Sequence, residues 1–270
     1  AQIIIPGMTH PYAGNLSQLS ASGISLVSLS TSMLSSGYQF VKEESVCVTT
    51  AAAIALPSMI SARIGTKLAA KLSSDALSLV FHSLSAILIP THCAVQHYAS
   101  TKHSTTTNED NINIDSTITN NDTKPQPKNA PTASPTIPIL LQHGTFGLFS
   151  GALSALMGVG GLPLTISYLT LFSISSPQQH LPHHIIQGTT ICAVAPGTIT
   201  SALSRLNAIP MQSAAIVTLS AMVGGSGGAK LALWLDDEAL RYLYMCSLVV
   251  LGGQSVVRSV GVMRRLWRKH

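Results

Sequence analysis

Charged residues are scarce in this chain. They make up 9% of the sequence, whereas a typical soluble domain has about 25%. Six stretches contain no Asp, Glu, Lys or Arg at all, namely residues 1–41, 45–62, 76–101, 129–204, 206–229 and 242–257. Each stretch is near or above the roughly 17 to 25 apolar residues that a membrane-spanning helix needs. The sequence therefore predicts an integral, multi-pass membrane protein of the all-α class.

Metal-binding and nucleic-acid-binding patterns are also missing. The four cysteines have neither CxxC nor metal-ligand spacing, and three loop histidines have no Cys or carboxylate near them, so no metal site and no cofactor are predicted. The basic residues form no patch interleaved with aromatics, which argues against nucleic acid as a partner. They crowd instead into residues 258–270, as expected of a cytoplasmic C-terminus beside anionic lipid. The residues in question are Cys47, Cys93, Cys192, Cys246, His180, His183 and His184.

An enzymatic site is not indicated either. Ser150 lies in the run GLFSG, but Leu148 stands where the turn of a serine hydrolase needs glycine. No histidine lies centrally in a predicted span to act as its base. We therefore interpret the chain as not an enzyme.

The uncharged stretches predict a polytopic bundle of about 7 to 8 spans. An Asn/Thr/Pro-rich tract at 99–138 cannot bury enough apolar surface to order itself, so it is expected to be a disordered linker. It separates two transmembrane units, residues 1–98 and 139–257. The chain begins with Ala1 and shows no signal-peptide pattern, so a fragment or a processed chain is expected. The expected spans are Gly14–Ser36, Ser45–Ala62, Ala76–Tyr98, Ile139–Ser173, Ile185–Leu203, Met211–Leu235 and Ala239–Val257.

The span 139–173 is interrupted by the motif GVGGLP, residues 158–163. Glycine weakens a helix, and proline removes a backbone donor. Backbone groups freed at membrane depth need partners, so a broken helix occurs only where it is buried in protein or lines a polar cavity. We expect this break to border a pathway or a binding site.

The two units look like repeats of one another. The segment GTKLAAKLSSDALS from Gly65 aligns without gaps on GAKLALWLDDEALR from Gly228, and GISLVSLS from Gly23 aligns on GTTICAVA from Gly188. Duplicated membrane units are the architecture of many secondary transporters, with the site where the repeats meet.

This pattern resembles the sulfite exporter TauE/SafE family of membrane transporters. The resemblance is carried by Gly151, the GVGGLP run, Gly188-Thr189-Thr190 and the twin motifs GTKLA and GAKLA. It covers nearly the whole chain except the linker. Members of the family move sulfite, sulfonates and related organosulfur anions, so the resemblance implies a small anionic solute as partner. Our hypothesis is secondary transport of this anion by alternating access between the two repeats.

The residues point independently to an anion. No charged side chain lies inside a predicted span, so no carboxylate is available there to hold a cation. Glycine N–H groups, helix N-termini and hydroxyls favour anions through their dipoles. The candidate substrate-binding residues are Gly158, Gly160, Gly161 and Pro163 in the break, Gly188, Thr189 and Thr190 as a facing wall, and Gly23 and Ser25 as its repeat counterpart.

Two alternatives stay open at this point. The glycine pairs Gly147/Gly151 and Gly224/Gly228 are more typical of close helix packing than of a site. The chain could also be a non-transporting membrane subunit with a role in assembly, and a homo-oligomer is compatible with either function.

Overall fold

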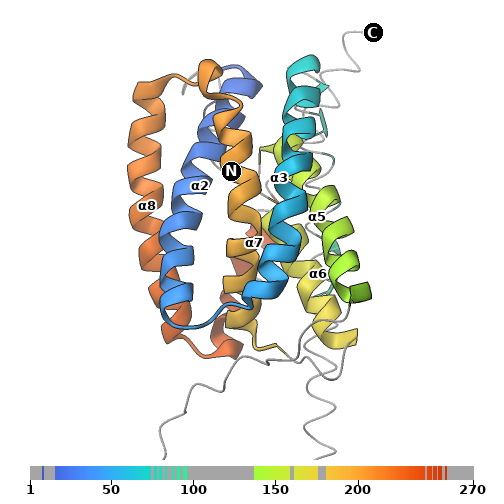
Figure 1. Ribbon diagram of the computed structural model, residues 1–270. Helices are drawn as coiled ribbons and strands as arrows, with labels where there is room; N and C mark the ends of the chain where they lie inside the picture. Colours follow the sequence, from blue (N-terminus) through green and yellow to red (C-terminus); the bar gives the residue numbers. More distant parts are fainter. Residues whose placement is uncertain are drawn as a thin grey trace, which may run out of the picture.

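The computed structural model is helical (Figure 1). It describes residues 8, 16–73, 76–77, 79–80, 83, 87, 90–91, 94–95, 137–158, 161–175, 181–240, 242–244, 246–247, 249–250 and 253, and no strand occurs among them. The linker up to residue 136, the basic tail and most of the expected spans 76–98 and 239–257 lie outside the described residues. The elements are α2 (Gln18–Lys42), α3 (Val48–Lys71), α5 (Ile137–Met157), α6 (Leu162–Ser175), α7 (His183–Leu203), the 3₁₀ turn η2 (Leu206–Ala208) and α8 (Met211–Trp234).

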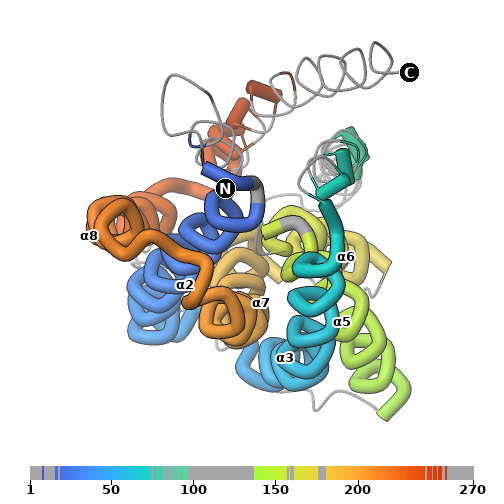
Figure 2. The backbone as a smooth tube through the Cα atoms, turned by 90° about the horizontal axis from the view of Figure 1, so that it is seen from above, coloured from blue at the N-terminus to red at the C-terminus, as the bar shows by residue number. Residues whose placement is uncertain are grey.

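Three of these helices, α3, α5 and α8, are long and apolar enough to cross a membrane by their length and composition. Seen from above, the helices lie across the bundle in the order α8, α2, α7, α3 and α5, with α7 central (Figure 2). The central helix thus contacts α2 on one side and α3 on the other.

Helix α2 is rich in serine yet largely buried. Ser17 caps its N-terminus by accepting the backbone N–H of Ser20. Several buried serines, among them Ser28 and Ser30, donate their hydroxyl hydrogens to carbonyls four residues earlier in the same helix. Because their polar groups are satisfied locally, these small side chains allow neighbouring helices to approach without leaving buried donors unpaired.

Helices α3 and α5 pack at close range through glycines. A Cβ at Gly65 would lie 2.3 Å from the carbonyl oxygen of Ala152, and one at Gly147 would lie 2.4 Å from that of Ile54. The packing interpretation is therefore confirmed for Gly147 and Gly151. For Gly224 and Gly228 it finds no support, since nothing lies within 4 Å of either position among the described residues.

The expected boundary of the second span is wrong. Helix α3 does not end near Ala62 but continues through Arg63, Lys67 and Lys71. All three side chains are exposed, while Gly65, Thr66 and Ala69 between them are buried. Charge alone was a poor guide to the end of the helix, because long Lys and Arg side chains near the end of a spanning helix can extend to the membrane surface.

The interrupted segment 139–173 is a helical hairpin. Helix α5 ends at Met157, and α6 starts at Leu162 and runs back beside it (Figure 1). Near the open end of the hairpin, the Phe146 ring stacks on Tyr168 at 3.9 Å between centroids. His143 Nδ1 lies 2.8 Å from the hydroxyl of the same tyrosine. The two halves are therefore antiparallel neighbours rather than one interrupted span.

At the end of the bundle where α7 begins, two of the three histidines predicted to lie in a loop are helical. His183 and His184 are the first residues of α7 rather than part of a loop, and Asp237 accepts hydrogen bonds from both of their backbone N–H groups. A carboxylate is thus beside them, 3.1 Å from His184 Nδ1. Within the described residues no group of three potential ligands gathers that could hold a metal ion.

Candidate functional site

The turn between α5 and α6 is the first component of the candidate site. Gly158 and Gly161 have φ angles of +71° and +68°, a conformation that residues with a side chain rarely adopt. Pro163 lies in the first turn of α6, where its missing N–H would have no partner in the helix anyway. Gly160 is outside the described residues. The glycines predicted from the motif therefore reverse the chain direction between the two helices of the hairpin.

Helix α2 contacts this turn directly through two serines. Ser25 Oγ donates to the carbonyl oxygen of Gly158 at 3.2 Å. A Cβ added to Gly158 would lie 2.7 Å from the Cβ of Ser22. The structure thus brings together Ser25 and the glycine turn, which the sequence placed in different repeats, 133 residues apart.

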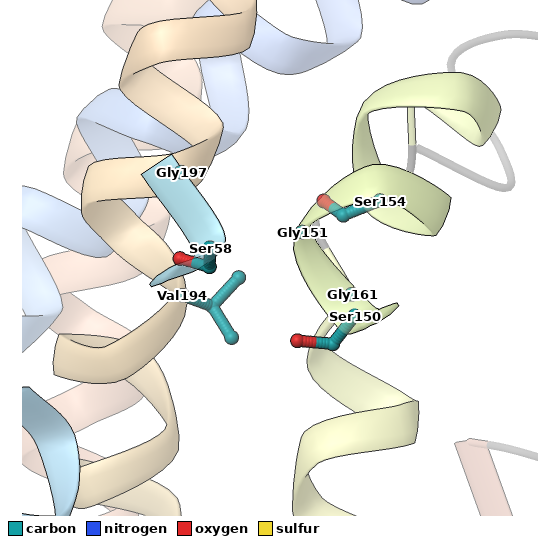
Figure 3. Close-up of a pocket in the computed structure, with 7 residues that line it drawn as sticks. All are labelled: Ser58, Ser150, Gly151, Ser154, Gly161, Val194 and Gly197. Carbon is teal, nitrogen blue, oxygen red and sulfur yellow. The ribbon is translucent and has the colours of Figure 1, made fainter. Parts of the chain in front are cut away.

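A small cavity lies beside the turn, between α3, α5 and α7 (Figure 3). It is about large enough for one water molecule. Ser150 and Ser154 point into it from α5 and face Val194 of α7 across the gap. Its lining consists of glycines, hydroxyls and one apolar side chain: Ser58, Ser150, Gly151, Ser154, Gly161, Val194 and Gly197.

Ser154 is the residue of this cavity that most suggests a ligand. Its side chain is buried, with 5% exposure, and its Oγ has no hydrogen-bond partner among the described residues. It is also close to the start of α6, because a Cβ at Gly161 would lie 3.5 Å from the Ser154 oxygen. Buried hydroxyls normally have partners, so an unpaired one beside a helix N-terminus is suited to an anion that enters the cavity.

Close helix approach shapes the cavity. A Cβ at Gly151 would lie 2.4 Å from the carbonyl oxygen of Ser58, and one at Gly197 would lie 2.9 Å from the Ser58 hydroxyl. Glycine at both positions therefore lets α5 and α7 converge on Ser58 of α3. The sequence analysis did not select Ser58, Ser154, Val194 or Gly197, because only the packing of three helices brings them together.

The predicted facing wall lies elsewhere. A Cβ at Gly188 would meet the carbonyl oxygen of Ser45 at 2.3 Å, and Thr189 Oγ1 accepts the backbone N–H of Cys47 at 2.9 Å. Thr190 is fully buried and donates to the carbonyl of Ile186 in its own helix. These residues pack the first half of α7 against the connection between α2 and α3. Gly188 is nine residues before Gly197 in the cavity, which is about 13.5 Å along a helix.

Gly23 makes the matching contact at the other end of the bundle. A Cβ there would lie 2.8 Å from Ile209, just after η2, and 3.7 Å from the Cβ of Arg205. It packs α2 against the connection between α7 and α8. Of the predicted wall, Ser25 is the residue with a contact to the described part of the glycine turn, Gly158.

Arg205 is the functional candidate that the sequence analysis missed. It follows α7 and is 3% exposed. Its Nη1 donates to Ser22 Oγ and its Nη2 to the carbonyl oxygen of Ala155, so the guanidinium lies beside the glycine turn. The sequence contains a feature that could have identified it, since Arg205 is a single charged residue between the uncharged stretches 129–204 and 206–229. The sequence analysis assigned this residue no role, because it lies between two predicted spans.

Comparison with known proteins supplies the family. The model of the family described as Sulfite exporter TauE/SafE matches residues 1–255, which confirms the resemblance seen in the motifs. No curated protein and no solved structure matches this chain.

Proposed function

Because this chain belongs to the sulfite exporter TauE/SafE family, we propose that it is a secondary transporter that moves a sulfur-containing anion, of the sulfite or sulfonate type, across a membrane. The family is one of integral membrane transporters rather than enzymes. The apolar helices α3, α5 and α8 agree with that setting.

The observation that carries the proposal is the unpaired hydroxyl of Ser154 in the cavity beside the glycine turn. The lining offers hydroxyls and the N-terminal end of α6, and no carboxylate. Such groups can donate hydrogen bonds to the oxygens of an anion but offer no negative charge to a cation. Ser154, Ser150 and Gly161 are therefore proposed to contact the substrate, with Gly158, Gly160 and Pro163 shaping the turn that presents them.

The proposed transport requires the cavity to open. Its present volume suits about one water molecule, whereas a sulfur oxyanion carries three or more heavy atoms around its sulfur. The hairpin of α5 and α6 would therefore have to move relative to α3 and α7 before a substrate could enter or leave. Such a movement is what alternating access between two bundles provides.

Helix contacts support the proposed duplication. Residues 48–71 of α3 shifted by 163 positions give 211–234, the bounds of α8. Helix α3 packs on α7, and α8 packs on α2. Gly23 of α2 contacts the connection after α7, while Gly188 of α7 contacts the connection after α2. Each contact made by α2 or α3 is thus matched by an equivalent contact made by α7 or α8, as expected of an inverted repeat.

The hairpin also affects which end of the bundle is expected to face the cytoplasm. Because α5 and α6 are two antiparallel helices, α8 begins at the end of the bundle where α3 finishes. A further span over 239–257 would then bring the basic tail to the same end as Arg63, Lys67 and Lys71. We propose that this end is cytoplasmic, in agreement with the charge bias of membrane proteins.

The test is flux of labelled sulfite, methanesulfonate and thiosulfate into liposomes that contain the purified protein. Ser154→Ala is expected to reduce flux of the preferred anion by roughly tenfold or more, the value of a hydrogen bond to a charged partner. Its stability should change by less than about 1 kcal/mol, because the hydroxyl has no partner to lose.

Ser220→Ala is the matched control, since this serine is exposed on α8 and donates only to Ile216 of its own helix. Equal flux in wild type and Ser154→Ala would remove the cavity from the mechanism. A folded wild-type protein that moves none of the three anions would favour the alternative role as a non-transporting subunit.

A further inference from the structure

Arg205 is a buried cation whose visible partners are all uncharged. Its two terminal nitrogens donate to a serine hydroxyl and a backbone carbonyl, and its Nε is buried without a hydrogen-bond partner among the described residues. The ion pair recorded in the described part of the chain, His184–Asp237, lies at the opposite end of α7. No described carboxylate therefore compensates the guanidinium.

Burial of an unpaired charge is unfavourable, because the ion loses its hydration without gaining a counter-ion. Burial lowers the pKa of Arg205 to about 10, which still leaves the group protonated at neutral pH. An uncompensated positive charge inside a helical bundle is thus a permanent attraction for a mobile anion.

The position of the guanidinium matches the proposed substrate path. Its acceptor Ala155 is the residue after Ser154, which lines the cavity. Its other acceptor, Ser22, lies against Gly158 in the turn. Arg205 therefore ties α2 to the end of α5 at the point where the hairpin reverses.

We propose, on the basis of the proposed transport function, that Arg205 is the specificity-determining residue that binds two oxygens of the substrate and releases α2 from α5 when it does so. A guanidinium presents parallel N–H groups that fit two oxygens on one sulfur. Carbonyl and hydroxyl oxygens are weaker acceptors than an anionic oxygen, so the substrate displaces them. The ligand class is a tetrahedral or pyramidal oxyanion, such as sulfite or an alkyl sulfonate, rather than a spherical halide.

The experiment measures binding and flux of sulfite, methanesulfonate and chloride for wild type, Arg205→Lys, Arg205→Gln and a control, Arg63→Gln. Arg63 is exposed on α3 near the same end of the bundle. Arg205→Gln should weaken sulfite and methanesulfonate binding by roughly a hundredfold, as for removal of one member of a buried charged pair. Arg205→Lys should keep the charge, recover part of the affinity and lose the preference for methanesulfonate over chloride. Arg63→Gln should behave as wild type.

A purely structural role would lower flux of all three anions equally, so an unchanged ratio of methanesulfonate to chloride overturns the inference. So does wild-type binding by Arg205→Gln. If neither Arg205 variant folds, Ser22→Ala decides the matter. Loss of a competing acceptor should leave sulfite affinity equal or higher, and a tenfold weaker affinity contradicts the proposal. A folded wild type that neither binds nor moves any oxyanion refutes the proposed transport function itself.

Discussion

Helices α3 and α8 carry the same motif but have different surroundings. Gly65 and Lys67 of α3 correspond to Gly228 and Lys230 of α8, 163 positions later. In α3 the glycine is pressed against the backbone of α5. In α8 the corresponding position has no neighbour within 4 Å in the part of the chain that the structure describes. The outer surface of the helix exposes apolar side chains: Met211, Ile216, Leu219, Met222 and Val223.

The difference shows that a motif that occurs twice in a chain need not make the same contact at both places. Helix α5 has no described counterpart beside α8. An exposed apolar surface on a helix of this length is suited to lipid. The hairpin of α5 and α6 therefore distinguishes the side of the bundle that holds the candidate site from the side formed by α8. Stability measurements can test this difference in packing between α3 and α8.

The largest expected difference is between Gly65→Ala and Gly228→Ala. The first substitution puts a methyl group 2.3 Å from the Ala152 carbonyl oxygen, and backbone cannot move aside cheaply, so we expect a loss of about 3 kcal/mol or more. The second substitution puts a methyl group where no described residue lies within 4 Å, so it should raise helix stability by about 0.5 to 1 kcal/mol. Unfolding in mixed detergent micelles measures both, and equal effects would show that the two glycines have similar surroundings.

A smaller effect separates two faces of α8 itself. A Cβ at Gly225 would lie 2.7 Å from the carbonyl oxygen of Ser32 in α2, whereas Gly227 has no neighbour within 4 Å among the described residues. Gly225→Ala should therefore destabilise by about 1 to 3 kcal/mol, and Gly227→Ala should not. If both variants unfold like wild type, α8 is not held against α2 as the structure has it.

The smallest effect concerns the residues that follow the two helices. Asp237 follows α8 and corresponds to Ser74 after α3. The hydrogen bond from His184 Nδ1 holds the pKa of Asp237 below its ordinary value. The stabilisation is thus present above about pH 4 and is lost as the pH falls through the lowered pKa.

Asp237→Asn should cost about 0.5 to 1 kcal/mol at neutral pH, since the pair is partly exposed, and this difference should vanish in acid. Unfolding of both proteins from pH 3 to pH 7 measures it, with exposed Asp236→Asn as the control. A difference that persists unchanged at pH 3 would mean that the carboxylate charge is not responsible.

Sequence reasoning located the glycine turn but not the cavity. Gly158, Gly161 and Pro163 were recognisable because their conformational properties are intrinsic to the residues. Ser58, Ser154 and Gly197 were not, because a serine or glycine in an apolar helix looks the same whether it faces lipid, a neighbour or a cavity. Arg205 was overlooked for a related reason. A charged residue between two spans is expected to be exposed to water, whereas here its side chain is buried.

The sequence alone determined that this chain is an all-helical membrane protein of the TauE/SafE family with a glycine turn, because hydrophobicity and backbone freedom are local properties. Only the tertiary structure decided that the turn closes an antiparallel hairpin, that residues of three helices line a cavity beside it, and that Arg205 lies buried against it. Those facts depend on which helix faces are neighbours, and contacts between segments that are distant in the sequence are not encoded in the pattern of any one of them.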